Sequence, residues 1–351
     1  MTDPPVEKAG QHKPDLIVEN KAAGVATGPL SPPAPVSAPT GPRRRGDRVF
    51  TGLTLGASVF VIGIIVAIAV FLIAKALPAL RDNTGNFLTT KDYQTQGAKP
   101  HFGVAALAFG TVFTSVVALL LAAPLGVGVA LYVTQYAHPR IARPVGYLVD
   151  LLAAVPSVVY GLWGVLFLAP HMKGLQHFLD QYFSWLPFFH PTASNPITTN
   201  SFLLASVVLA VMILPIITAI CREVFVQVPL ANKEAALALG ATKLEMIRTA
   251  VLPYSRAGMV SGIMLGLGRA LGETIAVALT LSAVNDVHWS LLGHGNTIAA
   301  NIATQYGEST PTGRSALIAT GLVLFVITLV VNLIARTIVY RSARLATKGS
   351  A

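Results

Sequence analysis

Residues 228–253 read VPLANKEAALALGATKLEMIRTAVLP, a stretch of helix-forming and charged residues between two long apolar runs. The whole chain of 351 residues contains 53% hydrophobic and only 11% charged residues, and its mean hydropathy is +0.64. This composition is too apolar for a soluble domain, and runs of about 20 apolar residues are long enough to cross a bilayer. The sequence therefore predicts an all-α polytopic membrane protein in which the quoted stretch connects two membrane spans.

The quoted stretch predicts two short helices joined by a glycine. Strong helix formers precede Gly240, which is a natural C-terminal stop. Thr242 and Glu245 have capping-box spacing, in which the hydroxyl accepts from the glutamate N–H and the carboxylate reaches back. We expect the second helix to end just before Pro253. This elbow (residues 222–256) is either a surface loop that folds back on the membrane helices or a docking site for a cytoplasmic partner.

Six apolar runs are long enough to span a membrane as helices. They lie at residues 50–74, 104–134, 145–169, 202–220, 257–283 and 316–335. Some contain internal prolines, which are tolerated because neighbouring helices can satisfy the freed backbone groups.

Lysine and arginine residues predict the orientation of these spans. Six spans place both termini on the same side of the membrane. If that side is the cytoplasm, 18 of the 25 lysines and arginines lie in inside segments and 6 in outside segments. Since positive charge is enriched in cytoplasmic segments, we expect both termini to be cytoplasmic. The remaining cation, Arg269, falls in the middle of the fifth span.

The same pattern divides the chain into three parts. Residues 1–48 are rich in proline and end in an arginine cluster, so we expect a disordered cytoplasmic tail. Residues 49–345 would form the six-helix domain, which includes the elbow. Residues 346–351 would form the C-terminal cytoplasmic end.

Three segments together resemble one family. The elbow resembles the EAA loop of ABC-transporter permeases, and the matching residues are Glu234, Ala235, Ala236, Gly240, Leu252 and Pro253. Residues 153–164, AAVPSVVYGLWG, and residues 269–274, RALGET, are similar to segments of phosphate-specific permeases. The resemblance covers about residues 50–340 and is to the PstC subunit, with the PstA subunit as a close cousin.

The resemblance implies a fold, a function and a set of partners. The fold is that of an ABC type I importer permease, in which the EAA loop forms a coupling helix that enters a cleft of the ATPase subunit. The function is half of the translocation path of an ATP-driven, high-affinity importer of inorganic phosphate in the bacterial plasma membrane. The implied partners are a PstA-like permease, two PstB-like ATPases and a PstS-like phosphate-binding protein, together with the lipid bilayer.

The RALGET segment carries the candidate path residues. Arg269 and Glu273 would lie one helical turn apart on one face, deep in a span where each ionisable group is costly. We expect them to pair and to line the path, because the arginine fork matches phosphate oxygens and Glu273 could hold it when phosphate is absent. Thr274 could add a hydroxyl. The alternative is a structural pair that faces the partner permease.

Other function classes fit the sequence less well. The chain lacks the GxxxxGK[ST] loop of ATPases, so we expect no enzyme activity and no cofactor, with ATP and Mg²⁺ bound by the partner. It also lacks a basic stripe with aromatic residues on a soluble domain, which argues against nucleic-acid binding. Two alternatives remain: a permease for another oxyanion such as molybdate or sulfate, and a stand-alone secondary transporter.

Overall fold

The computed structural model describes residues 45–91, 93–94, 101–190 and 197–348. The chain divides into two units, Met1–Val59 and Phe60–Ala351, and helix α1 (Arg45–Asp82) crosses the boundary between them. The expected tail lies outside the described residues except for its last four residues, which form the first turn of α1. The following description concerns Phe60–Ala351.

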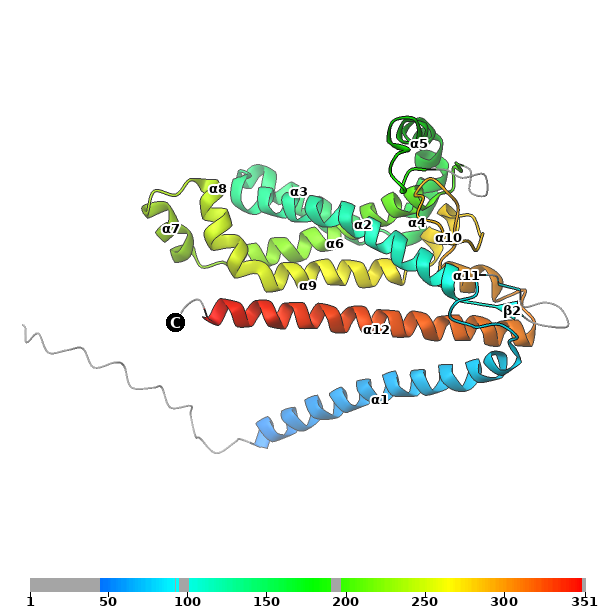
Figure 1. Cartoon of the computed structure of the whole chain (residues 1–351). Coiled ribbons are helices and arrows are strands. Elements are labelled where there is room, and N and C mark those ends of the chain that lie inside the picture. The colour runs from blue at the N-terminus through cyan, green and yellow to red at the C-terminus, as the bar shows by residue number, and fades with distance from the viewer. Residues whose placement is uncertain (1–44, 92, 95–100, 191–196, 349–351) are drawn as a thin grey trace, which may run out of the picture. The chain divides into compact units, whose positions relative to one another are not determined.

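The described part of this unit is almost entirely helical, with one short antiparallel pair of strands (Figure 1). From the end of α1 to the elbow the elements are β1 (Tyr93–Gln94), β2 (His101–Phe102), α2 (Ala105–Leu131), η1 (Tyr132–Tyr136), α3 (Pro139–Ala153), α4 (Ser157–Trp163), η2 (Gly164–Leu168), α5 (Ala169–Phe183) and α6 (Phe202–Val226). From the elbow onward they are α7 (Leu230–Ala238), α8 (Lys243–Met246), η3 (Ile247–Val251), α9 (Leu252–Leu271), α10 (Ile275–Thr280), α11 (Ile298–Gln305) and α12 (Pro311–Lys348).

Five helical segments among the described residues are long and apolar enough to cross a membrane. They are Val49–Asp82, Ala105–Tyr136, Ser157–Phe183, Phe202–Val226 and Pro311–Ile338. The all-α polytopic prediction is confirmed, whereas two of the six expected spans are not continuous helices. Helix α12 continues past residue 345, to Lys348.

The third expected span, 145–169, is broken at its middle. Helix α3 ends at Ala153, and Pro156 directly precedes α4. The residue before a proline is driven out of the helical region, which explains the break. The apolar helix here is instead Ser157–Phe183, so the segment after residue 169, expected as an outside loop, begins as helix α5.

The fifth expected span, 257–283, is also broken. Helix α9 ends at Leu271, and α10 begins at Ile275 after three non-helical residues. After α10 the chain runs without helix to Thr297, and this loop packs against the start of α6. The N–H groups of Phe202 and Leu203 donate to the carbonyls of Gly293 and Leu291, at 3.0 and 2.7 Å.

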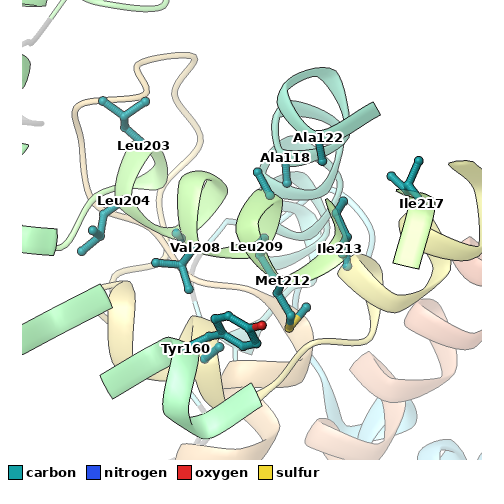
Figure 2. Packing of buried hydrophobic residues seen from close by; sticks show 14 of the residues in the cluster. Ala118, Ala122, Tyr160, Leu203, Leu204, Val208, Leu209, Met212, Ile213 and Ile217 are labelled. Carbon is teal, nitrogen blue, oxygen red and sulfur yellow. The ribbon is translucent and has the colours of Figure 1, made fainter. Parts of the chain in front are cut away.

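Helix α6 lies at the centre of the core, since 67% of its most apolar window is buried. Figure 2 shows its side chains, among them Leu209 and Ile213, beside Ala118 and Ala122 of α2, with Tyr160 of α4 nearby. Small residues let the two backbones approach. Since lipid is as apolar as leucine, dispersion contacts of this kind, rather than exclusion from water, hold membrane helices together.

The two ends of the unit differ in character. The elbow helices α7 and α8 lie at the same end as the C-terminal end of α12, whereas α11, β2 and α5 lie at the opposite end (Figure 1). Helix α9 therefore starts at the elbow end and runs antiparallel to α12, against which it packs.

Candidate functional site

The elbow folds as two capped helices, as its sequence predicts. Gly240 has φ +84°, a left-handed conformation that favours glycine. Its N–H donates to the Leu237 carbonyl at 3.0 Å, and the N–H of Ala241 donates to the Ala236 carbonyl at 3.2 Å. These two bonds form the Schellman arrangement that ends a helix. The glycine stop is confirmed.

The predicted capping box is also confirmed. The Glu245 N–H donates to Oγ1 of Thr242 at 3.4 Å, and the Thr242 N–H donates to Oε2 of Glu245 at 2.8 Å. Two hydrogen bonds lower the pKa of the Glu245 carboxyl. The larger effect comes from the backbone N–H of Thr242 and the smaller one from its hydroxyl. The start of α8 is therefore fixed by bonds within four residues.

Helix α7 contributes no buried residue to the core. Glu234 and Ala235 are exposed, and only Ala236 packs against core residues. Exposed leucines flank them: Leu239 is 89% exposed. An exposed helix with apolar side chains is typical of a surface that a partner covers.

The helix after the capping box does not stop at Pro253. Helical structure is continuous from Lys243 through η3 and α9 to Leu271, so the expected end before the proline is wrong. The turn before the proline is a π-helix, in which the Leu252 N–H donates to the Ile247 carbonyl. A single π-helical turn shifts the backbone hydrogen-bond pattern from i−4 to i−5 just before Pro253, which has no N–H to donate. The second half of the elbow and the residues near Arg269 therefore belong to one continuous helical segment, Lys243 to Leu271, which we call the rod.

A cation–π contact connects the elbow to the end of α2. The Lys243 ammonium lies 4.8 Å from the ring centroid of Tyr136 in η1. Both residues lie at the end of the unit that carries the elbow.

The three expected path residues lie together at the break between α9 and α10. Arg269 is exposed in the last turn of α9, Glu273 is half-buried in the break, and Thr274 directly precedes α10. The expected pairing on one helical face is wrong, because Gly272 ends the helix between the two charges. In the part of the chain that the structure describes, Arg269 forms no ion pair with Glu273. Oε1 of Glu273 instead accepts from the Ala276 N–H at 3.4 Å.

Helix α4, part of the first segment that resembles phosphate-specific permeases, packs on α10, which directly follows the second such segment. A Cβ added to Gly161 of α4 would lie 2.8 Å from Cα of Ala276, so only glycine permits this approach of α4 to α10. Tyr160 is buried and donates from its hydroxyl to the Leu152 carbonyl at 2.7 Å, across the break before Pro156. Two segments more than 100 residues apart in the chain therefore meet beside the α9–α10 break.

The glycines around Arg269 serve different purposes. A Cβ on Gly266 would lie 2.9 Å from Cγ1 of Ile217, so this residue makes room for α6. Gly268 has no neighbouring atom within 4 Å of its added Cβ. It lines a cavity of about 870 Å³ between α6, α9 and α12, together with Arg269 and Arg336.

One polar loop, residues 281–297, was not expected from the sequence. The Asn296 side-chain amide donates to Oδ1 of Asn285 and of Asn301, at 3.3 and 3.1 Å. The Ile298 N–H donates to Oγ1 of Thr111 in α2 at 3.0 Å. Asn285, Asn296 and Asn301 follow the last apolar residue of the expected fifth span, and this cluster of asparagines was the sequence signal for a polar loop. The described residues contain no group of three or more His, Cys, Asp or Glu placed to hold a metal.

Comparisons with known proteins agree on one family. A family model described as "Binding-protein-dependent transport system inner membrane component" matches residues 122–344. The chain is 46% identical over 319 residues to the "Phosphate transport system permease protein PstC 2" of Mycobacterium tuberculosis, covering 90% of this chain and 98% of the relative. It is 44% identical to the PstC of Mycobacterium leprae, covering 87% of this chain and 97% of the relative.

A more distant relative extends the match beyond one genus. The "Probable phosphate transport system permease protein PstC" of Methanocaldococcus jannaschii is 35% identical over 291 residues, with 81% of this chain and 91% of the relative covered. The resemblance that the EAA-like elbow and the two other segments indicated is therefore confirmed. The chain belongs to the family of binding-protein-dependent transport system inner membrane components, among the PstC permeases.

Proposed function

We propose that this chain is the PstC-like half of the translocation path of an ATP-driven importer of inorganic phosphate. The observation that carries the proposal is its 46% identity, over 90% of its length, to a phosphate transport system permease. The proposal includes a bacterial plasma-membrane location with both termini in the cytoplasm. It also includes a PstA-like permease, two PstB-like ATPases and a PstS-like binding protein as partners.

The elbow is the proposed docking site for the ATPase. Support comes from helix α7, which has no buried residue and is followed by the Gly240 turn and the Thr242 capping box. Glu234, Ala235 and Ala236 would enter the cleft of the ATPase, while Leu252 and Pro253 lead the chain back into the membrane. ATP and Mg²⁺ would be bound by that partner, and this chain would hydrolyse nothing.

The rod from Lys243 to Leu271 supports a coupling mechanism. At 1.5 Å per residue, a helix of this length carries a displacement of the elbow about 40 Å along its axis, to the turn that contains Arg269. The π-helical turn η3 and the break after Leu271 are the two points where the rod can bend relative to its neighbours.

The α9–α10 break is the proposed phosphate contact. Arg269 presents a planar fork of N–H donors that matches phosphate oxygens, and it is exposed rather than used inside this chain. Thr274 stands beside it with a hydroxyl, and Glu273 holds the first turn of α10 through the Ala276 N–H. An exposed cation that no described residue pairs fits a path that a second permease completes from the other side.

The test is ATP-dependent uptake of labelled phosphate into vesicles that contain the complete complex. We expect uptake by the wild type, and assembly without uptake for Arg269→Gln. Excess sulfate and molybdate serve as competitors. If sulfate or molybdate blocks uptake, the substrate is another oxyanion rather than phosphate. If uptake proceeds without ATP, the protein is a secondary transporter. Normal uptake by Arg269→Gln would remove Arg269 from the path.

The docking role is tested separately by Glu234→Lys. We expect this variant to lose the ATPase on co-purification and to lose ATP-driven uptake, while the two permeases still assemble. Glu308→Lys is the matched control, because it makes the same charge change at an exposed position at the opposite end of the unit. Retention of the ATPase and of uptake by Glu234→Lys would contradict docking through α7.

A further inference from the structure

The cavity beside Arg269 contains a second arginine. It lies between α6, α9 and α12, measures about 870 Å³, and is lined by Arg269 and Gly268 of α9 and by Asn332, Ala335 and Arg336 of α12. Its lining includes no carboxylate. The lining residues of α12 belong to the apolar segment Pro311–Ile338, which is long enough to cross the membrane.

The two arginines approach the cavity from opposite ends. Helical side chains lean toward the N-terminus of their own helix. Helix α9 starts at the elbow end, so Arg269, in its last turn, leans back along the cavity toward that end. Helix α12 runs the other way, so Arg336 leans from the elbow end toward the opposite one. Both guanidinium groups are therefore directed into the same space.

Neither arginine has an acidic partner among the residues that the structure describes. Across residues 45–348, excluding the three gaps that the structure does not describe, the one ion pair is that of Arg222 with Asp150. An unpaired cation within a membrane span is costly, and Arg336 lies in the apolar segment Pro311–Ile338, so this arginine needs an anion that the described residues do not supply. Attraction to the headgroup region alone would account for Arg336 at this depth, but it would not require a cavity shared with Arg269.

Asn332 adds a neutral donor one turn from Arg336. Its amide makes no hydrogen bond to any residue that the structure describes, so both N–H groups are available to a ligand. Ser261 also lines the cavity, but its hydroxyl donates to the Ala257 carbonyl at 2.9 Å and is not assigned a ligand role.

We propose that Arg336 and Asn332 form a second anion subsite for phosphate, on the elbow side of Arg269. This inference rests on the proposed function and adds a residue to it. Phosphate released by Arg269 would meet Arg336 within the same cavity before it leaves the membrane. A weak, multi-site path of this kind lets an anion enter and also leave.

The test uses a cysteine at Leu265, an apolar residue of α9 that lines the cavity and is 58% exposed. Inside-out vesicles with the complete complex are treated with a small maleimide, with and without inorganic phosphate. The natural Cys221 is buried and stays in place, and the chain without an added cysteine gives its background. We expect phosphate to slow labelling of Leu265→Cys. Leu333→Cys, which is 57% exposed and does not line the cavity, should show no protection.

The decisive variant is Arg336→Gln in the Leu265→Cys chain. We expect the phosphate concentration for half-protection to rise about tenfold or more, as for loss of one charge-assisted hydrogen bond. Arg314→Gln is the charge-matched control on the first turn of the same helix, where its guanidinium lies over the Tyr306 ring, and it should leave protection unchanged.

Each other outcome has a defined meaning. If phosphate gives no protection, or if Arg336→Gln leaves the protection unchanged, the subsite is overturned. Phosphate uptake by the wild type would still support the proposed function in either case. Protection by sulfate or molybdate alone, removed by Arg336→Gln, would keep the subsite and overturn the phosphate assignment. Protection that follows the anionic lipid content of the vesicles and ignores added phosphate would assign Arg336 to a lipid headgroup and overturn the proposal.

Discussion

Nη2 of Arg222 donates to both carboxylate oxygens of Asp150, at 3.0 Å each. The pair ties α3 to the elbow end of α6, at the first residue of the elbow. The two side chains are 26% and 49% exposed, so solvent screens their attraction. Gly146, one turn before Asp150 on α3, leaves space for the guanidinium: an added Cβ would lie 2.5 Å from Nη1.

The pair should stabilise the chain only modestly. We expect Asp150→Asn and Arg222→Gln each to lower stability, with a coupling energy between them of about 0.2–1 kcal/mol, as for other partly exposed pairs. A double-mutant cycle on thermal unfolding of the detergent-purified chain measures that coupling. A coupling energy near zero would show that the pair orients the helices without stabilising them.

Gly146→Ala tests the space that the guanidinium occupies. Glycine to alanine within a helix favours the helix by about 1 kcal/mol when nothing else changes. Here the new methyl group would displace Arg222, so the gain should be smaller by about the energy of the pair. In the Arg222→Gln background the full gain should return. Equal gains in both backgrounds on thermal unfolding would show that the arginine adapts without cost.

Local sequence predicted the elbow well because its determinants are local. The Gly240 turn and the Thr242–Glu245 capping box involve bonds between residues at most five apart, so their pattern can be read from spacing. The apolar runs predicted helices for the same reason. The all-α membrane architecture and the family could therefore be inferred from the amino-acid sequence alone.

The break after Leu271 could not be found in this way. By hydropathy, residues 257–283 form one apolar run. Gly272 and Glu273 do not lower the mean hydropathy of this run enough to reveal an interruption. Beyond the break, α10 packs on Gly161 of α4, and spacing along the chain does not reveal a contact between residues more than 100 positions apart. The predicted pairing of Arg269 with Glu273 is wrong for the same reason, because i, i+4 spacing brings two side chains together only in a continuous helix.

Gly240→Ala should weaken the elbow through backbone strain alone. No atom lies within 4 Å of an added Cβ, so there is no clash, whereas φ +84° costs an L-residue about 1–2 kcal/mol. Asparagine tolerates this region better, so Gly240→Asn should cost less. Hydrogen-exchange protection of α7 measures both changes. Equal protection in the alanine variant and the wild type would contradict a strained turn.

The capping box should make the start of α8 sensitive to acid. The pKa of Glu245 is lowered in the folded chain, so its contribution is present above the unfolded pKa and is lost as pH falls through the folded pKa. We expect the protection factors of the Thr242 and Glu245 amides to fall on acidification below the ordinary glutamate range. Glu245→Gln can still accept from the Thr242 N–H without a charge, so its protection should not depend on pH. An identical acid response in both chains would assign the effect to another group.

Glu273 can be tested as an N-terminal cap against the alternative role of counter-ion to Arg269. The structure shows its carboxylate accepting from the Ala276 N–H, with Arg269 unpaired among the described residues. Glutamine preserves the acceptor and removes the charge, whereas alanine removes both. We therefore expect Glu273→Gln to keep phosphate uptake near the wild-type rate. Glu273→Ala should lower it about fivefold, which corresponds to about 1 kcal/mol for a lost cap. Equal loss in both variants, with normal assembly, would show that transport needs the negative charge itself and that Glu273 meets Arg269 in another state of the transport cycle.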